Sequence, residues 1–256
     1  GNIIASIITA ADDTVTLTAA GANNQTSGVI TADGLRFDAG GSVTLTKIDV
    51  NTIAGQTTAA GAIQITDTDD LTVGTVLGLS GIRSFDGTIT VNAVGITVDD
   101  ISFVDPEIDA GDSTVTLNAG TGTLILNGNV NATGGVTYIA DNMTLVGTTN
   151  AGTGFVSLMP ATSGRPINLG SEEAGSLSLT ADELDTITAG AIIIGDSGLN
   201  SGNITISAAI SPANSPALAL LSGGTITQTQ GATITVDNLV IVADGAVNLN
   251  ENNDEK

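Results

Sequence analysis

Short segments in which polar and aliphatic residues alternate recur along the whole chain, with Thr favoured at the polar positions. Alternation with a period of two predicts a β-strand with one buried face. Val, Ile and Thr also favour the pleated setting of a sheet. Clear copies begin at Thr14, Ser42, Thr88, Thr114, Ser176 and Asn203, and looser copies cover Ile63–Ile65, Val136–Tyr138, Phe155–Leu158 and Thr225–Thr229.

The copies recur with a period that is typical of a repeat protein. Their first aliphatic residues are 20 to 28 positions apart, with a mean of about 23. A second aliphatic pair, such as Leu124 and Leu126, lies between most copies, so each repeat is expected to carry at least two strands. The ten residues compared are Val15, Val43, Ile63, Ile89, Val115, Val136, Val156, Leu177, Ile204 and Ile226.

A repeat of this length is too short for a β-sandwich, which needs about 100 residues. It matches one coil of a solenoid in which strands stack on equivalent strands of the next coil. We therefore predict an all-β, right-handed parallel β-helix of roughly ten to twelve coils, about 50–60 Å long. Residues 1–250 would form a single β-solenoid and residues 251–256 an acidic tail. The best helical candidate, Ser171–Leu184, is interrupted by Gly175.

Composition excludes several functions. Hydrophobic residues make up 41% of the chain but aromatic residues only 2%, which favours thin stacked layers over a globular core. The formal net charge of −22 opposes binding to nucleic acids and to anionic membranes. There is no Cys and no His, so disulfides, thiol catalysis and Cys-ligated zinc are excluded and hydroxyl nucleophiles lack their usual base. No stretch is apolar enough to span a bilayer. Because the chain begins with Gly1, we expect a processed protein or a fragment.

One acidic segment is a candidate metal site. Asp67, Asp69 and Asp70 lie in a loop rich in oxygen ligands, the kind that calcium prefers. Neither an EF-hand loop nor the glycine-rich calcium repeat is present. The favoured interpretation is a turn whose backbone is capped by Asp side chains, with calcium as the alternative. No other cofactor is expected.

Carboxylate pairs raise the alternative of a polysaccharide-acting enzyme. Glycoside hydrolysis needs an acid and a base held apart at a fixed distance in a cleft. The few aromatic and basic residues do not supply the usual sugar platforms, so we expect no enzymatic activity. The pairs considered are Asp99/Asp100, Asp105/Glu107 and Asp182/Asp185, and the arginines that could assist are Arg36, Arg83 and Arg165.

The region between residues 176 and 210 resembles a known family. Ser178-Leu179-Thr180-Ala181-Asp182-Glu183-Leu184-Asp185-Thr186-Ile187-Thr188-Ala189-Gly190, and the copy that continues through Ile192–Ile194 to Asn203–Ser207, are similar to repeats of filamentous-haemagglutinin-like proteins. These are large bacterial adhesins of the two-partner and autotransporter type. The resemblance implies a right-handed β-helix that forms a stalk on the cell surface. The family's secretion domain and membrane barrel are not visible in this chain.

We therefore expect a non-catalytic, structural and adhesive rod segment of a large secreted or surface-exposed bacterial adhesin. Its partners would be glycans or proteins on host or neighbouring cells, contacted by the loops Thr148–Gly154, Pro160–Pro166 and Ser211–Pro216. The alternative is an extracellular filament subunit that stacks head to tail through exposed strand edges in its end coils. Gly1–Thr9 would then dock on another subunit.

Overall fold

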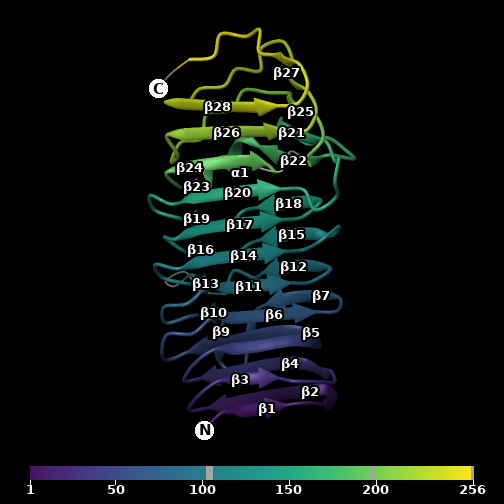
Figure 1. The fold of residues 1–256 in the computed structure, drawn as a ribbon, viewed down its shortest axis with the longest axis vertical. Helices are drawn as coiled ribbons and strands as arrows, with labels where there is room; N and C mark the ends of the chain where they lie inside the picture. The colour runs from purple at the N-terminus through teal and green to yellow at the C-terminus, as the bar shows by residue number, and fades with distance from the viewer. Residues whose placement is uncertain (102–105, 197, 199, 255–256) are drawn as a thin grey trace.

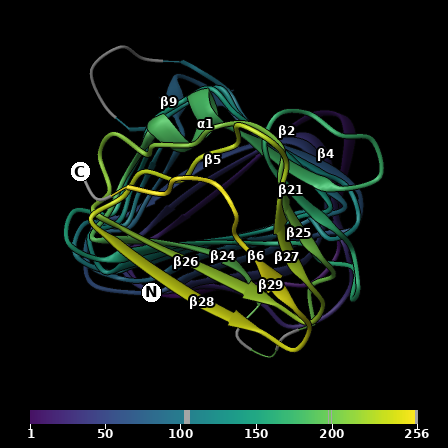
Figure 2. The same ribbon diagram turned by 90° about the horizontal axis from the view of Figure 1, so that it is seen from above.

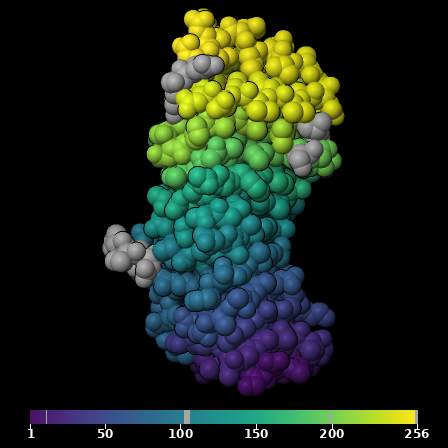
Figure 3. Space-filling view, turned by 60° about the vertical axis from the view of Figure 1, so that its left-hand side comes forward, coloured from purple at the N-terminus to yellow at the C-terminus, as the bar shows by residue number. Residues whose placement is uncertain are grey.

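The structure is a computed structural model that describes residues 1–101, 106–196, 198 and 200–254, and it is all-β, with 54% strand and 2% helix. Parallel strands stack along one axis in a solenoid-like arrangement (Figure 1), and the space-filling view shows an elongated body (Figure 3). We call the longest stack the first ladder. It contains β1 (Ile3–Ala5), β3 (Asn23–Gln25), β5 (Val43–Thr57), β6 (Ile63–Asp67), β11 (Ile89–Asn92), β14 (Thr114–Asn118), β17 (Gly135–Ile139), β20 (Phe155–Met159), β24 (Ala191–Gly195), β26 (Ala217–Ser222) and β28 (Asn238–Ala243).

The inward-facing side chains of the first ladder form a continuous aliphatic row. Each residue pairs in register with its equivalent in the next strand, so aliphatic side chains pack directly on one another. Burying one such side chain contributes roughly 1.5–3 kcal/mol, which makes the row the main stabilising element of this side. Its fully buried members are Val43, Ile63, Ile89, Val115, Val136, Val156, Ile192 and Leu218.

Viewed from above, the solenoid has three sides (Figure 2). Near the N-terminus the long strands β2 (Ile8–Ala19), β4 (Ile30–Ala39) and β5 run over more than one side. Further along, each side has its own short strands. The second side contains β7 (Asp70–Val73), β12 (Gly95–Val98), β15 (Thr123–Leu126), β18 (Asn142–Leu145), β22 (Leu177–Thr180), β21 (Ile167–Gly170), β25 (Ile204–Ile206), β27 (Ile226–Gln228) and β29 (Val247–Asn248).

The third side is the most irregular. Its strands are β10 (Ile82–Arg83), β13 (Ile108–Asp109), β16 (Val130–Asn131), β19 (Thr149–Asn150) and β23 (Ile187–Thr188). An antiparallel hairpin of β8 (Thr75–Val76) and β9 (Leu79–Ser80) comes before β10, and the short helix α1 (Ala181–Asp185) comes before β23. One passage of the chain through the three sides is called a winding below.

A recurring Asx-Ala-Gly sequence makes several corners. The Oδ1 atoms of Asp109, Asn118 and Asn150 each accept a hydrogen bond of 3.0 Å from the backbone N–H of the glycine two residues later. Those glycines have φ between 54° and 56°, a conformation that glycine adopts without steric cost. The intervening alanines are fully buried, because only a small side chain fits inside the corner.

The corner at Asn150 lies in a segment that was expected to be a protruding loop, and this expectation is wrong. The segment 148–154 does not leave the coil as a loop, because its strand β19 pairs with β16 below and β23 above. The other two segments expected as loops, Pro160–Pro166 and Ser211–Pro216, do lie between strands.

The expected equivalence of the ten aliphatic residues is also partly wrong. Val15 pairs with Leu35 between β2 and β4, whereas Leu177, Ile204 and Ile226 belong to the second side. The first ladder instead continues from Val156 to Ile192, a step of 36 residues. All sides use the same alternation, so the pattern alone does not show on which side a strand lies.

The two end windings leave inward positions partly exposed. Near the N-terminus these are Ile3 and Ile8, and near the C-terminus they include Leu239, Ile241 and Val247, which is 44% exposed. Residues 251–254 of the expected acidic tail contact the preceding winding. Asn253 Oδ1 accepts hydrogen bonds from the backbone N–H of Ile234 at 2.8 Å and from Gln228 Nε2 at 2.7 Å.

Candidate functional site

The regular stacking is interrupted on the second side, within the 36-residue step of the first ladder. β21 and β22 are consecutive and parallel, and β21 lies between β22 and β25 in their sheet. The chain therefore forms β21 first, in the position next to β25, and then returns to form β22 one position lower in the stack. β22 contacts β18, yet the two strands belong to different sheets. The strands of the second side therefore separate between β18 and β22, and we call this place the fork.

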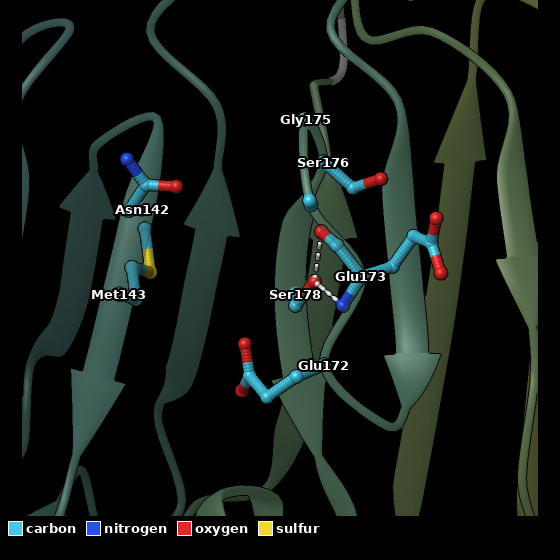
Figure 4. Close-up of a pocket in the computed structure, with 8 residues that line it drawn as sticks. Asn142, Met143, Glu172, Glu173, Gly175, Ser176 and Ser178 are labelled. Atoms are coloured by element: carbon cyan, nitrogen blue, oxygen red, sulfur yellow. Dashed lines mark hydrogen bonds between the residues drawn. The ribbon is translucent and has the colours of Figure 1, made fainter.

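A pocket of about 220 Å³ lies at this fork (Figure 4). Glu172 points toward the gap beside β18, whereas Glu173 points to the opposite side of its loop. The two carboxylates therefore do not face one another as an acid and base pair would. Ser178 Oγ holds the loop by accepting from the backbone N–H of Glu173 at 2.9 Å and donating to its carbonyl at 3.1 Å.

The carboxylate of Glu183 bridges the two strands of the fork. Its Oε1 accepts from the backbone N–H of Leu145 in β18 at 3.0 Å. Its Oε2 accepts from the N–H and Oγ1 of Thr180 at 2.8 and 2.9 Å, which completes a capping box at the start of α1. The sequence prediction missed this role of Glu183, although the spacing Thr180-x-x-Glu183 is the signature of a capping box.

We expect Glu183→Gln to destabilise the fork. A Gln side chain keeps one acceptor but turns an N–H₂ group toward the donors that Oε2 now satisfies. The expected loss is about 1–2 kcal/mol of unfolding free energy. Urea denaturation measures the loss, and hydrogen exchange at the amides of Leu145 and Thr180 locates it. The control is Asp182→Asn, an exposed residue of the same helix, which should change stability by less than about 0.5 kcal/mol. Equal effects of both variants would contradict the bridging role.

The fork holds the carboxylates of Glu172 and Glu183 and the guanidinium of Arg165. Burial, together with the negative charge of Glu183, raises the pKa of Glu172. Arg165 contacts two of the residues that line the pocket. It donates to Asn142 Oδ1 at 3.0 Å and to the carbonyl of Ser176 at 3.2 Å, and also to the carbonyl of Asp141 at 2.8 Å. Arg165 therefore fastens the inserted strand to the winding below.

The calcium candidates lie where β6 meets β7. Asp67 is buried, and its two carboxylate oxygens accept from the backbone N–H groups of Asp69 at 3.0 Å and Val50 at 3.1 Å. The side chains of Asp67 and Asp69 are also in contact, whereas Asp69 and Asp70 are both exposed. In the described part of the chain, no group of three or more His, Cys, Asp or Glu side chains is placed to hold a metal ion. These contacts fit the Asp-capped turn.

Because of Asp67, we expect the free energy of unfolding to depend on pH in an unusual way. Burial, reinforced by Asp69, raises its pKa to about 7. In the unfolded chain this pKa would be about 3.9, so between about pH 4 and pH 7 the folded state binds a proton that the unfolded state lacks. The free energy of unfolding should therefore fall as pH rises through this window.

Urea midpoints measured at pH 5 and pH 7.5 test this expectation. The chain should be more stable at pH 5, and Asp67→Asn should reduce the difference between the two pH values. The other acidic residues of the chain also gain protons at low pH. The contribution of Asp67 is therefore isolated only by comparing the wild type with this variant. Parallel stability curves for the wild type and the variant would contradict the raised pKa.

The carboxylate pairs considered for hydrolysis are spread over the solenoid. Asp99, Asp100, Asp182 and Asp185 are exposed, and Asp185 Oδ1 accepts from the backbone N–H of Ala213 at 2.8 Å. Asp105 lies outside the described residues. Glu107 is buried, and its Oε2 accepts from the backbone N–H of Asn129 at 2.6 Å.

The three arginines that could assist hydrolysis lie on different parts of the solenoid. Arg36 pairs with Asp38 at 2.8 Å, Arg83 lies in β10, and Arg165 lies at the fork. Arg83 lies close to one member of a candidate pair, because the backbone N–H of its neighbour Ile82 donates to the Glu107 carbonyl at 2.7 Å. The other member of that pair, Asp105, lies outside the described residues.

No protein-family model, curated protein or solved structure matches this chain. The described part of the chain holds no helix that is long and apolar enough to cross a membrane.

Proposed function

We propose that this chain is a structural and adhesive rod segment of a large secreted or surface-exposed bacterial adhesin, and that it is not an enzyme. The single observation that supports this proposal is the first ladder, in which all the strands run in the same direction from β1 to β28 over one aliphatic row. Such a stack lengthens by adding windings without a new core, which suits a stalk.

The handedness, the number of coils and the length of the rod are part of the same proposal. The right-handed form is the default for parallel crossovers, and we adopt it here. The eleven strands of the first ladder support ten to twelve coils. At about 4.8 Å between strands, such a stack is about 50 Å long. Glycans or proteins on other cells would bind the segments outside the strands, chiefly Pro160–Pro166 and Ser211–Pro216.

Surface labelling tests the proposed location. Antibodies raised against the purified chain should label intact cells of the source organism, and beads coated with the chain should adhere to target cells. Beads coated with the heat-denatured chain are the control. Label that appears only after lysis, or sugar released from a polysaccharide panel by the purified chain, would overturn the proposal.

A head-to-tail filament is the second candidate, and the partly exposed inward residues of both end windings favour it. β1 and β28 are the two ends of the same ladder, so a second copy could place Ile3 over Leu239 and Ala5 over Ile241. Electron microscopy distinguishes the candidates. Single rods of about 50 Å support the stalk segment, whereas long fibres of constant width support the filament.

A further inference from the structure

The outward-facing row of the first ladder changes character along the rod. Between β11 and β17 it consists of the register-matched residues Thr90, Thr116 and Thr137. After Ser157 in β20, the same row continues as Ile193, Ala219 and Val240. A surface that begins with hydroxyl groups thus ends with aliphatic side chains.

The aliphatic part extends beyond this one row. Phe155 lies at an outward position of β20 and is 45% exposed, and Leu221 pairs with Val242 in a neighbouring outward row. Val240 and Val242 are 52% and 44% exposed. Contiguous apolar surface of this kind marks interaction sites more often than isolated exposed residues do. We call the six residues Phe155, Ile193, Ala219, Leu221, Val240 and Val242 the aliphatic face.

Acidic residues lie at the strand ends beside the aliphatic face. Asp196 directly follows β24, and Asp237 and Asp244 directly flank β28. Hydrogen bonds from the Gly198 N–H and from Asn200 lower the pKa of Asp196, which keeps its carboxylate ionised. Residues 166–254 contain ten Asp and Glu and no Lys or Arg. A second copy of this chain would therefore bring like charges together at this face.

We propose that the aliphatic face docks a cationic amphipathic helix of a partner protein. The apolar side of the helix would cover β24, β26 and β28, and its Lys or Arg side chains would reach the acidic residues at the strand ends. A helix about 10 Å in diameter spans two to three strands that are about 4.8 Å apart. Helix on sheet is also a common way to bury an apolar sheet face. This docking surface would exist in a stalk or in a filament, so it does not depend on the function proposed above.

Peptide binding tests the proposal with the full chain. The probe is a labelled 18-residue synthetic helix with a Leu and Ala face flanked by Lys, and the matched peptide carries Glu in place of Lys. Fluorescence anisotropy should show binding of the Lys peptide only, with an affinity that falls as salt is added. Ile193→Thr combined with Val240→Thr should weaken binding at least tenfold. Thr already occupies the same outward row in β11, β14 and β17, so this variant should keep the fold.

Val146→Thr is the matched control, because Val146 is 66% exposed and lies outside the aliphatic face. It should bind the Lys peptide as the wild type does. The proposal is overturned if the Lys peptide fails to bind, or if the Ile193→Thr/Val240→Thr variant binds it equally well. Sedimentation that shows the wild type, but not this variant, forming dimers would assign the face to a second copy instead.

Discussion

Deleting residues 115–135 should leave a folded solenoid that is one winding shorter. The deletion joins Thr114 to Val136, so β17 would take the place of β14 and stack on β11. Val136 would then lie over Ile89, and Tyr138 over Val91, which keeps aliphatic or aromatic side chains in both inward rows. Because stability in such a stack is roughly a sum over windings and their interfaces, losing one winding removes one increment only.

The matched control is a deletion of residues 115–124, about half a winding. It brings residues of the second side into the first ladder and leaves too little chain to reach the third side. We expect this variant to lose the β-sheet signal in far-UV circular dichroism. The full-winding deletion should keep that signal and shorten the rod by about 4.8 Å in small-angle scattering. Equal damage from both deletions would show that the winding is not the structural unit.

The sequence predicted the strand content and the parallel stacking because both follow from local pattern and period. Alternation of Thr with Val, Ile or Leu marks a strand whichever side it lies on, as in Thr88–Asn92 and Thr114–Asn118. The period of about 23 residues then indicated stacked coils. The assignment of strands to sides could not be predicted, because it depends on where the corners and insertions fall. Leu177, Ile204 and Ile226 show this, since their pattern is that of the first ladder but they lie on the second side.

The fork was less predictable than the windings. Its geometry depends on β21 and β22 occupying two positions of one sheet within a single winding, which no periodic pattern encodes. The bridging of Leu145 by Glu183 joins residues 38 positions apart. Acidic residues are common in this chain, so composition did not distinguish Glu183 from the solvent-exposed acids. Only the capping-box spacing, three residues after Thr180, set it apart.

Long-range register also determines which residues must be small, and Gly55 is the clearest case. It pairs with Phe37, whose ring is fully buried, and a Cβ atom at position 55 would lie 2.2 Å from Phe37 Cε1. Gly55→Ala should therefore force the ring out of its position. Overpacking of this kind costs about 1–3 kcal/mol, and a residue larger than Ala should cost more. Chemical denaturation of the full chain measures the loss.

A double-mutant cycle separates the ring contact from any effect on the backbone. Phe37→Leu alone should destabilise the core because it leaves a cavity, but in the double variant the smaller Leu leaves room for the new methyl group. We expect the double variant to lose at least about 1 kcal/mol less than the sum of the single variants. The control is Gly41→Ala, because a Cβ there would lie 3.7 Å from its nearest neighbours, an ordinary contact. If Gly55→Ala proves as mild as Gly41→Ala, the ring moves aside without cost, and the register does not require a glycine opposite Phe37.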